Sequence, residues 1–319
     1  MSDRKTSVDC IYVAASRHDS RHTRIAVASV RYFYPDIPVR ILAGGRLRRG
    51  LLEELRQYWD VTLADIPVGE YGWGFVKLEA LFGPPGERFV VLDSDTALTG
   101  PILDTWADSD APFLVDNEEH PETAKKEIYY DWRRLHEIDP AANPPRFLFN
   151  SGQWRGTAGI LTRDDFAPWV EWAFPRRLRH PQCFMPGDQG ILNYVLNQKA
   201  MLDGLRVECR PIMRWAARDL QDFDAERLAT KAAKPLIIHW AGLKKARLSQ
   251  MNGFDLLAFF EKIYYRRLPG GTSRRILASY LYTLSFWLRE IRVRIRLRTQ
   301  LVIGAIREGK LRTAFIKYD

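Results

Sequence analysis

The amino-acid sequence predicts an α/β fold, with a mixed, mainly parallel sheet flanked by helices and a basic helical C-terminal extension. Strand-like and helix-like segments alternate from residue 8 onward, as in parallel sheets with right-handed crossovers. The apolar run 89–92 is typical of a strand buried on both faces. Basic charge gathers near the C-terminus. We therefore expect one domain over 1–265 and a tail over 266–319.

The first part of the chain supplies three strands. The expected elements are strand 8–16, helix 21–34, strand 39–43, helix 50–59 and strand 61–66. The first strand ends in small residues, so the backbone at Ala14 and Ala15 could lie close to a flat base; an ordinary strand end is the alternative. No G-x-G-x-x-G follows this strand, which argues against a nicotinamide-type dinucleotide site.

Asp93-Ser94-Asp95 directly follows the apolar run. Two carboxylates one residue apart at the end of a buried strand are unfavourable unless a positive charge lies between them. Mn²⁺ and Mg²⁺ prefer carboxylate and phosphate oxygens, so a cation shared with a substrate diphosphate would supply that charge. A solvated turn is the alternative, because a bare Asp-x-Asp is a short pattern.

The rest of the chain adds further elements and polar candidates. The expected elements are a helix-like segment 72–82, a strand 111–115, a loop 121–145, a strand within 147–161, a helix 164–174, a helix 191–198 and a strand 236–240. The candidates are Lys77, Asp116, Asp188, Gln189 and His239. Three of them have a plainer alternative: a solvated lysine at Lys77, a helix N-cap at Asp188 and a hydrogen-bonded core histidine at His239. Glycine and lysine after the last strand suit a turn around a phosphate.

Assembled in order, three pieces resemble the GT-A glycosyltransferases of retaining family 8, which include glycogenin and the lipooligosaccharide galactosyltransferases. The pieces are Leu92-Asp93-Ser94-Asp95-Thr96, Gly187-Asp188-Gln189-Gly190-Ile191-Leu192-Asn193 and His239-Trp240-Ala241-Gly242-Leu243-Lys244-Lys245. The resemblance covers residues 8–250. It implies the GT-A fold, a nucleotide-sugar donor that is usually UDP-linked, and transfer with retention.

The resemblance also assigns roles by position. It makes Asp93, Asp95 and His239 ligands of Mn²⁺, or of Mg²⁺. It places Asp188 and Gln189 at the sugar and acceptor. Lys77, Gly242 and Lys245 match its donor-binding positions. Together with Ala14, Ala15, Ser94 and Asp116, they are the residues that we expect to bind the donor. Three points stay open. The diphosphate lysine is Lys245 or Lys244, the family's Asn-Ser-Gly aligns at Asn150 or Thr157, and Arg17-His18-Asp19 replaces the expected acidic residues after the first strand.

Two other function classes remain. A nucleotidyltransferase on a similar sheet would carry a Gly-rich basic loop after the first strand, and none is present. A non-catalytic nucleotide-sugar-binding protein would keep the cleft without turning over a UDP-sugar. For an enzyme, we expect the metal and Lys245 to stabilise the departing diphosphate. Oxygens of Gln189, Asp188 or Asp116 are expected to stabilise the positive charge on the sugar.

The basic and apolar residues of the tail indicate a further partner, an anionic membrane surface. Residues 266–319 hold 13 Lys and Arg against three acidic residues, a net charge of +10, so the other 265 residues sum to −1. The apolar segment 276–288 is too short to span a bilayer, which needs about 20 residues. Arginines beside aromatic rings suit a helix in the headgroup layer. A helix packed on the domain is the alternative, and nucleic acid is least favoured.

Three scattered cysteines and the lack of a signal peptide favour a reducing compartment. We therefore expect a cytoplasmic protein, attached peripherally to the cytoplasmic face of a membrane through its tail. The expected acceptor is a glycan or a lipid-linked molecule presented at that surface.

Overall fold

A computed structural model describes residues 8–72, 74–117, 128–218, 220–242, 245 and 247–307. Its centre is a seven-stranded sheet in the order β10-β6-β7-β4-β1-β2-β3. These strands are β1 (Cys10–Ala15), β2 (Val39–Ala43), β3 (Val61–Leu63), β4 (Arg88–Asp93), β6 (Phe113–Asp116), β7 (Gln153–Thr157) and β10 (Val207–Arg210). Only β7 runs antiparallel to its neighbours, β4 and β6. The mixed, mainly parallel sheet is thus confirmed.

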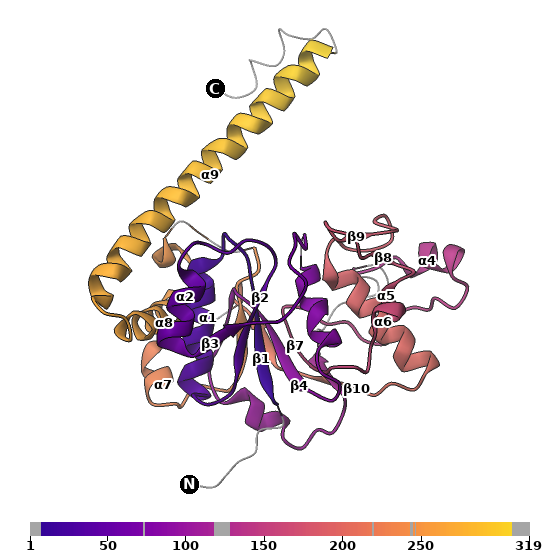
Figure 1. Cartoon of the computed structure of the whole chain (residues 1–319), viewed down its shortest axis with the longest axis horizontal. Coiled ribbons are helices and arrows are strands. Elements are labelled where there is room, and N and C mark those ends of the chain that lie inside the picture. The colour runs from indigo at the N-terminus through magenta and orange to yellow at the C-terminus, as the bar shows by residue number, and fades with distance from the viewer. Residues whose placement is uncertain are drawn as a thin grey trace.

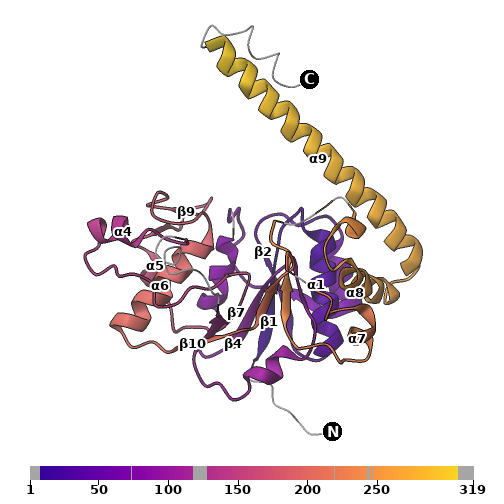
Figure 2. The same cartoon turned by 180° about the vertical axis from the view of Figure 1, so that it is seen from behind.

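Helices cover both faces of this sheet (Figures 1 and 2). The α-helices are α1 (Ser20–Phe33), α2 (Leu51–Trp59), α4 (Trp132–Ile138), α5 (Arg163–Phe166), α6 (Asp188–Leu202), α7 (Ala225–Ala229), α8 (Phe254–Arg266) and α9 (Gly271–Arg307). Three 3₁₀ segments are η1 (Phe75–Phe82), η2 (Ile102–Trp106) and η3 (Leu248–Gln250). Two smaller sheets join β11 (Met213–Trp215), β12 (Ile237–His239) and β5 (Thr96–Leu98), and β8 (Val170–Glu171) with β9 (Arg177–Leu178).

Alternation along β4 explains why its sequence is apolar throughout. Val90 and Leu92 enter the core under α1 and α8, whereas Phe89 and Val91 enter the core under α6 and η1. Successive side chains of a strand point to opposite faces, and both faces of this strand are covered. The strand therefore reaches Asp93 from a fully buried position and delivers its carboxylate to the edge of the sheet.

Some predicted elements differ from the structure. The helix expected over 164–174 is wrong beyond residue 166, because α5 ends there and Val170 enters a short antiparallel ribbon with Leu178. The third strand is shorter than expected and ends at Leu63. Within the loop expected over 121–145, the described part contains α4, and residues 118–127 lie outside the described residues.

The C-terminal extension is a long helix, α9, that leaves the domain beside α8 (Figures 1 and 2). Its first turns are fastened by Arg21 of α1, which pairs with Glu261 at 3.0 Å, donates to Ser279 at 3.1 Å and lies over the ring of Tyr282. Leu268, between α8 and α9, is buried in the core. The packed domain therefore continues a few residues past 265. In the described part of the chain, no helix is long and apolar enough to cross a membrane.

Candidate active site

A cleft of about 510 Å³ opens where β1 and β4 end, bounded by η1, the start of α6 and the end of β12. Parallel strands end at one edge of a sheet, and ligands of open α/β sheets bind there. The cleft brings together segments that lie far apart in the sequence. Its lining includes Ala14, Ala15, Lys77, Asp93, Ser94, Asp95, Asp188, Gln189, His239 and Gly242.

Asp93, Asp95 and His239 form a compact cluster in this cleft. One potential ligand atom from each lies within 4.8 Å of the others. His239 Nε2 is 3.4 Å from Asp95 Oδ1 and 3.9 Å from Asp93 Oδ2. Two carboxylates and an imidazole nitrogen aimed at one point are a donor set that suits Mn²⁺ or Mg²⁺. The cluster therefore fits a divalent cation.

Backbone pairing brings His239 to the aspartates. β5 follows Asp95 immediately and pairs antiparallel with β12, so that Thr96 lies opposite His239. The Trp240 amide donates to the Asp95 carbonyl at 2.9 Å, and the Asp93 amide donates to the Gly152 carbonyl at 2.7 Å. The position of each ligand is therefore fixed by a backbone hydrogen bond rather than by its side chain alone.

The His239 ring is held by packing. Trp215 stacks on it with ring centroids 5.2 Å apart and planes 20° apart. A Cβ added to Gly152 would lie 2.4 Å from His239 Cε1, so only glycine fits there. Nδ1 is buried without a hydrogen-bond partner among the described residues. Histidine side chains that bind metals are usually oriented by a hydrogen bond to the second ring nitrogen. In this structure the His239 ring is oriented by its stacking on Trp215 instead.

Lys77 is buried and joins two carboxylates. Its Nζ lies 3.1 Å from Asp93 Oδ1 and 3.0 Å from Asp188 Oδ2. It also donates to the carbonyl and hydroxyl of Ser151, at 2.9 and 3.1 Å. Burial lowers the pKa of Lys77, but Asp188 and Asp93 outweigh burial and the pKa of Lys77 is raised overall. Burial raises the pKa of Asp188, and Lys77 opposes that shift. A charged lysine therefore links the cluster of Asp93, Asp95 and His239 to α6.

Gln189 fixes the loop in front of β7. Its Oε1 accepts from the Ser151 amide at 2.8 Å and from Asn150 Nδ2 at 3.3 Å. Its Nε2 donates to the Phe149 carbonyl at 2.5 Å. Both polar ends of the side chain are therefore engaged with the loop that also holds Lys77.

The comparisons with known proteins bear on the fold. No protein-family model matches the chain, and the search of curated proteins finds no match. Among solved structures, the galactosyltransferase LgtC, in complex with donor and acceptor sugar analogs, matches with a TM-score of 0.52 and 15% identity. That match covers 80% of this chain and 94% of LgtC. The apo WbbM bifunctional glycosyltransferase matches with a TM-score of 0.51 and 14% identity, over 83% of this chain and 50% of WbbM.

The chain has the GT-A fold. The fold-level resemblance expected from the sequence is thus confirmed, and the chain spans half the length of WbbM. Identities this low leave the activity to be argued from the cleft itself.

The GT-A cleft contains ten of the twelve residues predicted for the site. The roles assigned to them stay predictions. Two positions were left open for the family's Asn-Ser-Gly, Asn150 and Thr157. The structure favours Asn150, because Asn150 and Ser151 line the cleft, whereas Thr157 lies at the far end of β7 opposite Arg88. Lys77 is not the solvated lysine of the alternative, since it is 4% exposed.

Asp116 and Lys245 are not among the cleft-lining residues. Asp116 Oδ1 accepts from the amides of Ile212 and Met213, at 2.9 and 3.0 Å, and so braces the connection from β10 to β11. Its predicted contact with the donor stays a prediction. Lys245 is exposed, and Lys244 lies outside the described residues, so the choice of phosphate lysine stays a prediction.

The alternative that Asp188 is only the N-cap of its helix is wrong. Gly187 is the N-cap of α6, and Asp188 is its first residue. A Cβ on Gly74 would lie 1.9 Å from Asp188 Oδ1, so the carboxylate rests against backbone that must be glycine. Trp215 was missed, because a three-residue strand gives no periodic signal in the sequence.

Proposed function

We propose that this protein is a metal-dependent glycosyltransferase that moves a hexose from a nucleotide-sugar, expected to be a UDP-hexose, to a glycan or lipid-linked acceptor with retention. The observation that carries the proposal is the convergence of Asp93, Asp95 and His239 at the carboxyl edge of a GT-A sheet. The likeness to LgtC, whose structure holds donor and acceptor sugar analogs, supports a donor and an acceptor side by side.

Asp93, Asp95 and His239 would hold Mn²⁺ or Mg²⁺ together with the donor diphosphate. When bound, such an ion would offset the negative charge that develops on the departing diphosphate. Ala14, Ala15, Ser94 and Gly242 line the cleft. The backbone of Ala14 and Ala15 would lie against the flat base, and Ser94 and Gly242 would lie next to the diphosphate. Lys245 is the proposed second positive group for the phosphates.

The residues of α6 and η1 would act on the sugar. Asp188 offers a carboxylate oxygen to the anomeric carbon as positive charge develops there. Lys77 holds that carboxylate in place through the 3.0 Å ion pair and offsets its repulsion with Asp93. Gln189 positions the Asn150–Ser151 loop. In a retaining reaction the acceptor oxygen attacks from the face that the diphosphate leaves.

A donor screen tests this proposal. UDP-, GDP- and CMP-sugars are incubated with the protein in Mn²⁺ or in excess chelator, and release of the nucleoside diphosphate or monophosphate is measured. We expect slow release of UDP from one UDP-hexose, abolished by chelator and restored by Mn²⁺. Full activity in chelator would contradict the metal site. Binding without turnover of any donor would favour the non-catalytic alternative.

We further propose that α9 attaches the domain to an anionic membrane surface. On the side turned away from the domain, the helix carries exposed apolar side chains every three or four residues, which lie along one face. They are Leu277, Leu281, Leu284, Leu288, Ile291 and Ile295. The exposed side chains of Arg289, Arg292 and Arg294 flank them. Each basic residue near an anionic surface contributes about 1 kcal/mol.

Replacing Leu284, Trp287 and Ile291 together by serine should abolish binding to vesicles containing anionic lipid, because these side chains are 57%, 50% and 51% exposed. The thermal unfolding midpoint should not change, since they lie beyond the packed turns of α9. Vesicle co-sedimentation measures the loss, and wild-type binding should weaken with salt. The control is Ile138→Ser with Leu202→Ser, exposed apolar residues elsewhere. Unchanged sedimentation of the triple variant, or dimerisation through α9 instead, would contradict the membrane role.

A further inference from the structure

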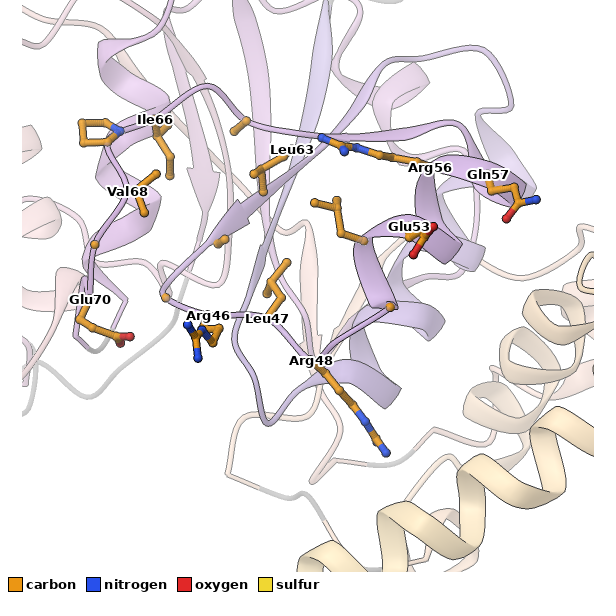
Figure 3. Close-up of a pocket in the computed structure, with 17 residues that line it drawn as sticks. Arg46, Leu47, Arg48, Glu53, Arg56, Gln57, Leu63, Ile66, Val68 and Glu70 are labelled. Atoms are coloured by element: carbon orange, nitrogen blue, oxygen red, sulfur yellow. The ribbon is translucent and has the colours of Figure 1, made fainter.

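A second hollow, of about 1170 Å³, lies beside the donor cleft where β2 and β3 end against α2 (Figure 3). Its apolar lining includes Leu47, Leu52, Leu63, Ile66 and Val68. Leu47 and Leu63 both project into the hollow in Figure 3. Val68 is 98% exposed, which is unusual for a valine, and Leu63 is 38% exposed. The chain therefore leaves an aliphatic surface open to solvent at this edge of the sheet.

The lining is aliphatic rather than aromatic. No Phe, Tyr, Trp or His is among the described residues that line the hollow. Sugar rings offer polar edges, and aliphatic side chains have no hydrogen-bonding groups to match them. Branched aliphatic side chains suit an extended hydrocarbon chain, whose burial contributes about 0.8 kcal/mol per CH₂.

Basic side chains stand at the rim of this surface. Arg46, Arg48 and Arg56 line the hollow. Figure 3 shows Arg56 reaching from α2 toward Leu63, whereas the end of the Arg48 side chain points away from Leu63. Within the described part of the chain, neither Arg46 nor Arg56 makes an ion pair or hydrogen bond. Glu53 and Glu70 also line the hollow. An arginine without a carboxylate partner beside apolar surface suits an acidic group attached to an apolar chain.

The hollow adjoins the donor cleft. Gly44 lines the cleft, and its two neighbours, Ala43 and Gly45, line the hollow. A Cβ on Gly45 would lie 2.6 Å from Glu70 Oε2, so Glu70 rests on the backbone between the two spaces. The strand order β4-β1-β2-β3 puts the hollow two to three strands from Asp93, roughly 10–15 Å at the usual strand spacing. One amphipathic molecule can span that distance.

We propose that this hollow anchors the acceptor, and that the acceptor is an anionic lipid-type molecule. Its hydrocarbon chain lies on the leucines and Val68, its acidic linker meets Arg46 and Arg56, and its sugar end reaches past Gly44 into the donor cleft. The inference rests on the proposed glycosyltransferase function and specifies its acceptor class. It also agrees with α9, which leaves the domain on the side of the sheet where β1 and β2 end (Figures 1 and 2).

Calorimetric titration of the full chain with dodecyl phosphate, below its micelle concentration, tests the anchor. Inorganic phosphate lacks the chain and dodecyl maltoside lacks the acid, so both should bind far more weakly. The Arg46→Gln/Arg56→Gln double variant should bind dodecyl phosphate about tenfold more weakly or worse, because it loses charge-assisted hydrogen bonds. Val68→Asp should also weaken binding. The matched control is Arg49→Gln, an exposed arginine of the same loop that does not line the hollow; any binding to α9 is common to both variants.

Equal affinity of the double variant and the Arg49 control would overturn the proposal, and so would equal binding of inorganic phosphate or of dodecyl maltoside. Binding of UDP with Mn²⁺ to the wild-type chain is measured in parallel. Loss of UDP binding with the dodecyl phosphate result intact would contradict the proposed transfer reaction but leave the anionic lipid site. UDP binding without selective dodecyl phosphate binding would remove the anchor and leave the transferase.

Discussion

Replacing Asp95 by asparagine is expected to abolish turnover while leaving the fold intact. The asparagine side chain keeps the size of the aspartate but removes a charge from the cluster of Asp93, Asp95 and His239. The folded apo-protein should lose little stability, because two carboxylates that face each other without a cation repel. kcat should fall at least about a hundredfold, the usual effect of removing one group that stabilises developing charge.

Steady-state release of UDP measures the loss of activity, electron paramagnetic resonance measures Mn²⁺ affinity, and circular dichroism follows unfolding. The matched control is Asp164→Asn, an exposed aspartate in the first turn of α5. If the Asp95 variant kept both its Mn²⁺ affinity and its kcat, Asp95 would not be a metal ligand.

Replacing Asp188 by asparagine should also have a large effect, and by a different route. The substitution removes one carboxylate from a buried ion pair of 3.0 Å and leaves Lys77 with Asp93 and Ser151 alone. Breaking a buried pair costs about 3–5 kcal/mol, and the remaining partners of Lys77 place the expected loss at the lower end. We expect a lower unfolding midpoint and a kcat reduced at least about a hundredfold, with little change in the donor KM.

The role of Asp188 is decided by comparing the change in the unfolding midpoint with the change in kcat. Asp255→Asn, which changes an exposed acid in the first turn of α8, is the control for helix-end charge. Because Gly187 rather than Asp188 caps α6, loss of capping cannot explain a defect. Reduced stability with unchanged kcat would make the Lys77–Asp188 pair purely structural.

The central part of the fold could be predicted because its signals are local. The apolar run before Asp93 is buried by two cores, and β1, β2 and α1 show clear periodicity and end signals. The short strands β5 and β11 could not be predicted, since three residues carry no period. Trp169 and Val170 gave a helix-like pattern, but pairing of β8 with β9 overrode it.

The site could be predicted where its residues are close together in the sequence. It was harder to predict where pairing between distant strands determines which residues meet. Asp93 and Asp95 follow directly from the end of β4. His239 lies beside them only because β12 pairs antiparallel with β5. The sequence of β12 does not indicate which strand it pairs with. Asp116 also ends an apolar strand, yet its carboxylate meets two amides nearly a hundred residues away. An acid at a strand end is therefore a candidate that only tertiary pairing can assign.

The most direct test of this account is a crystal structure of the wild-type protein with Mn²⁺ and UDP, with manganese located by anomalous diffraction. The account predicts one manganese peak, bound by an oxygen of Asp93, an oxygen of Asp95 and Nε2 of His239 and in contact with the diphosphate. UDP bound in the cleft with manganese elsewhere, or with these three side chains turned away from it, would contradict the account.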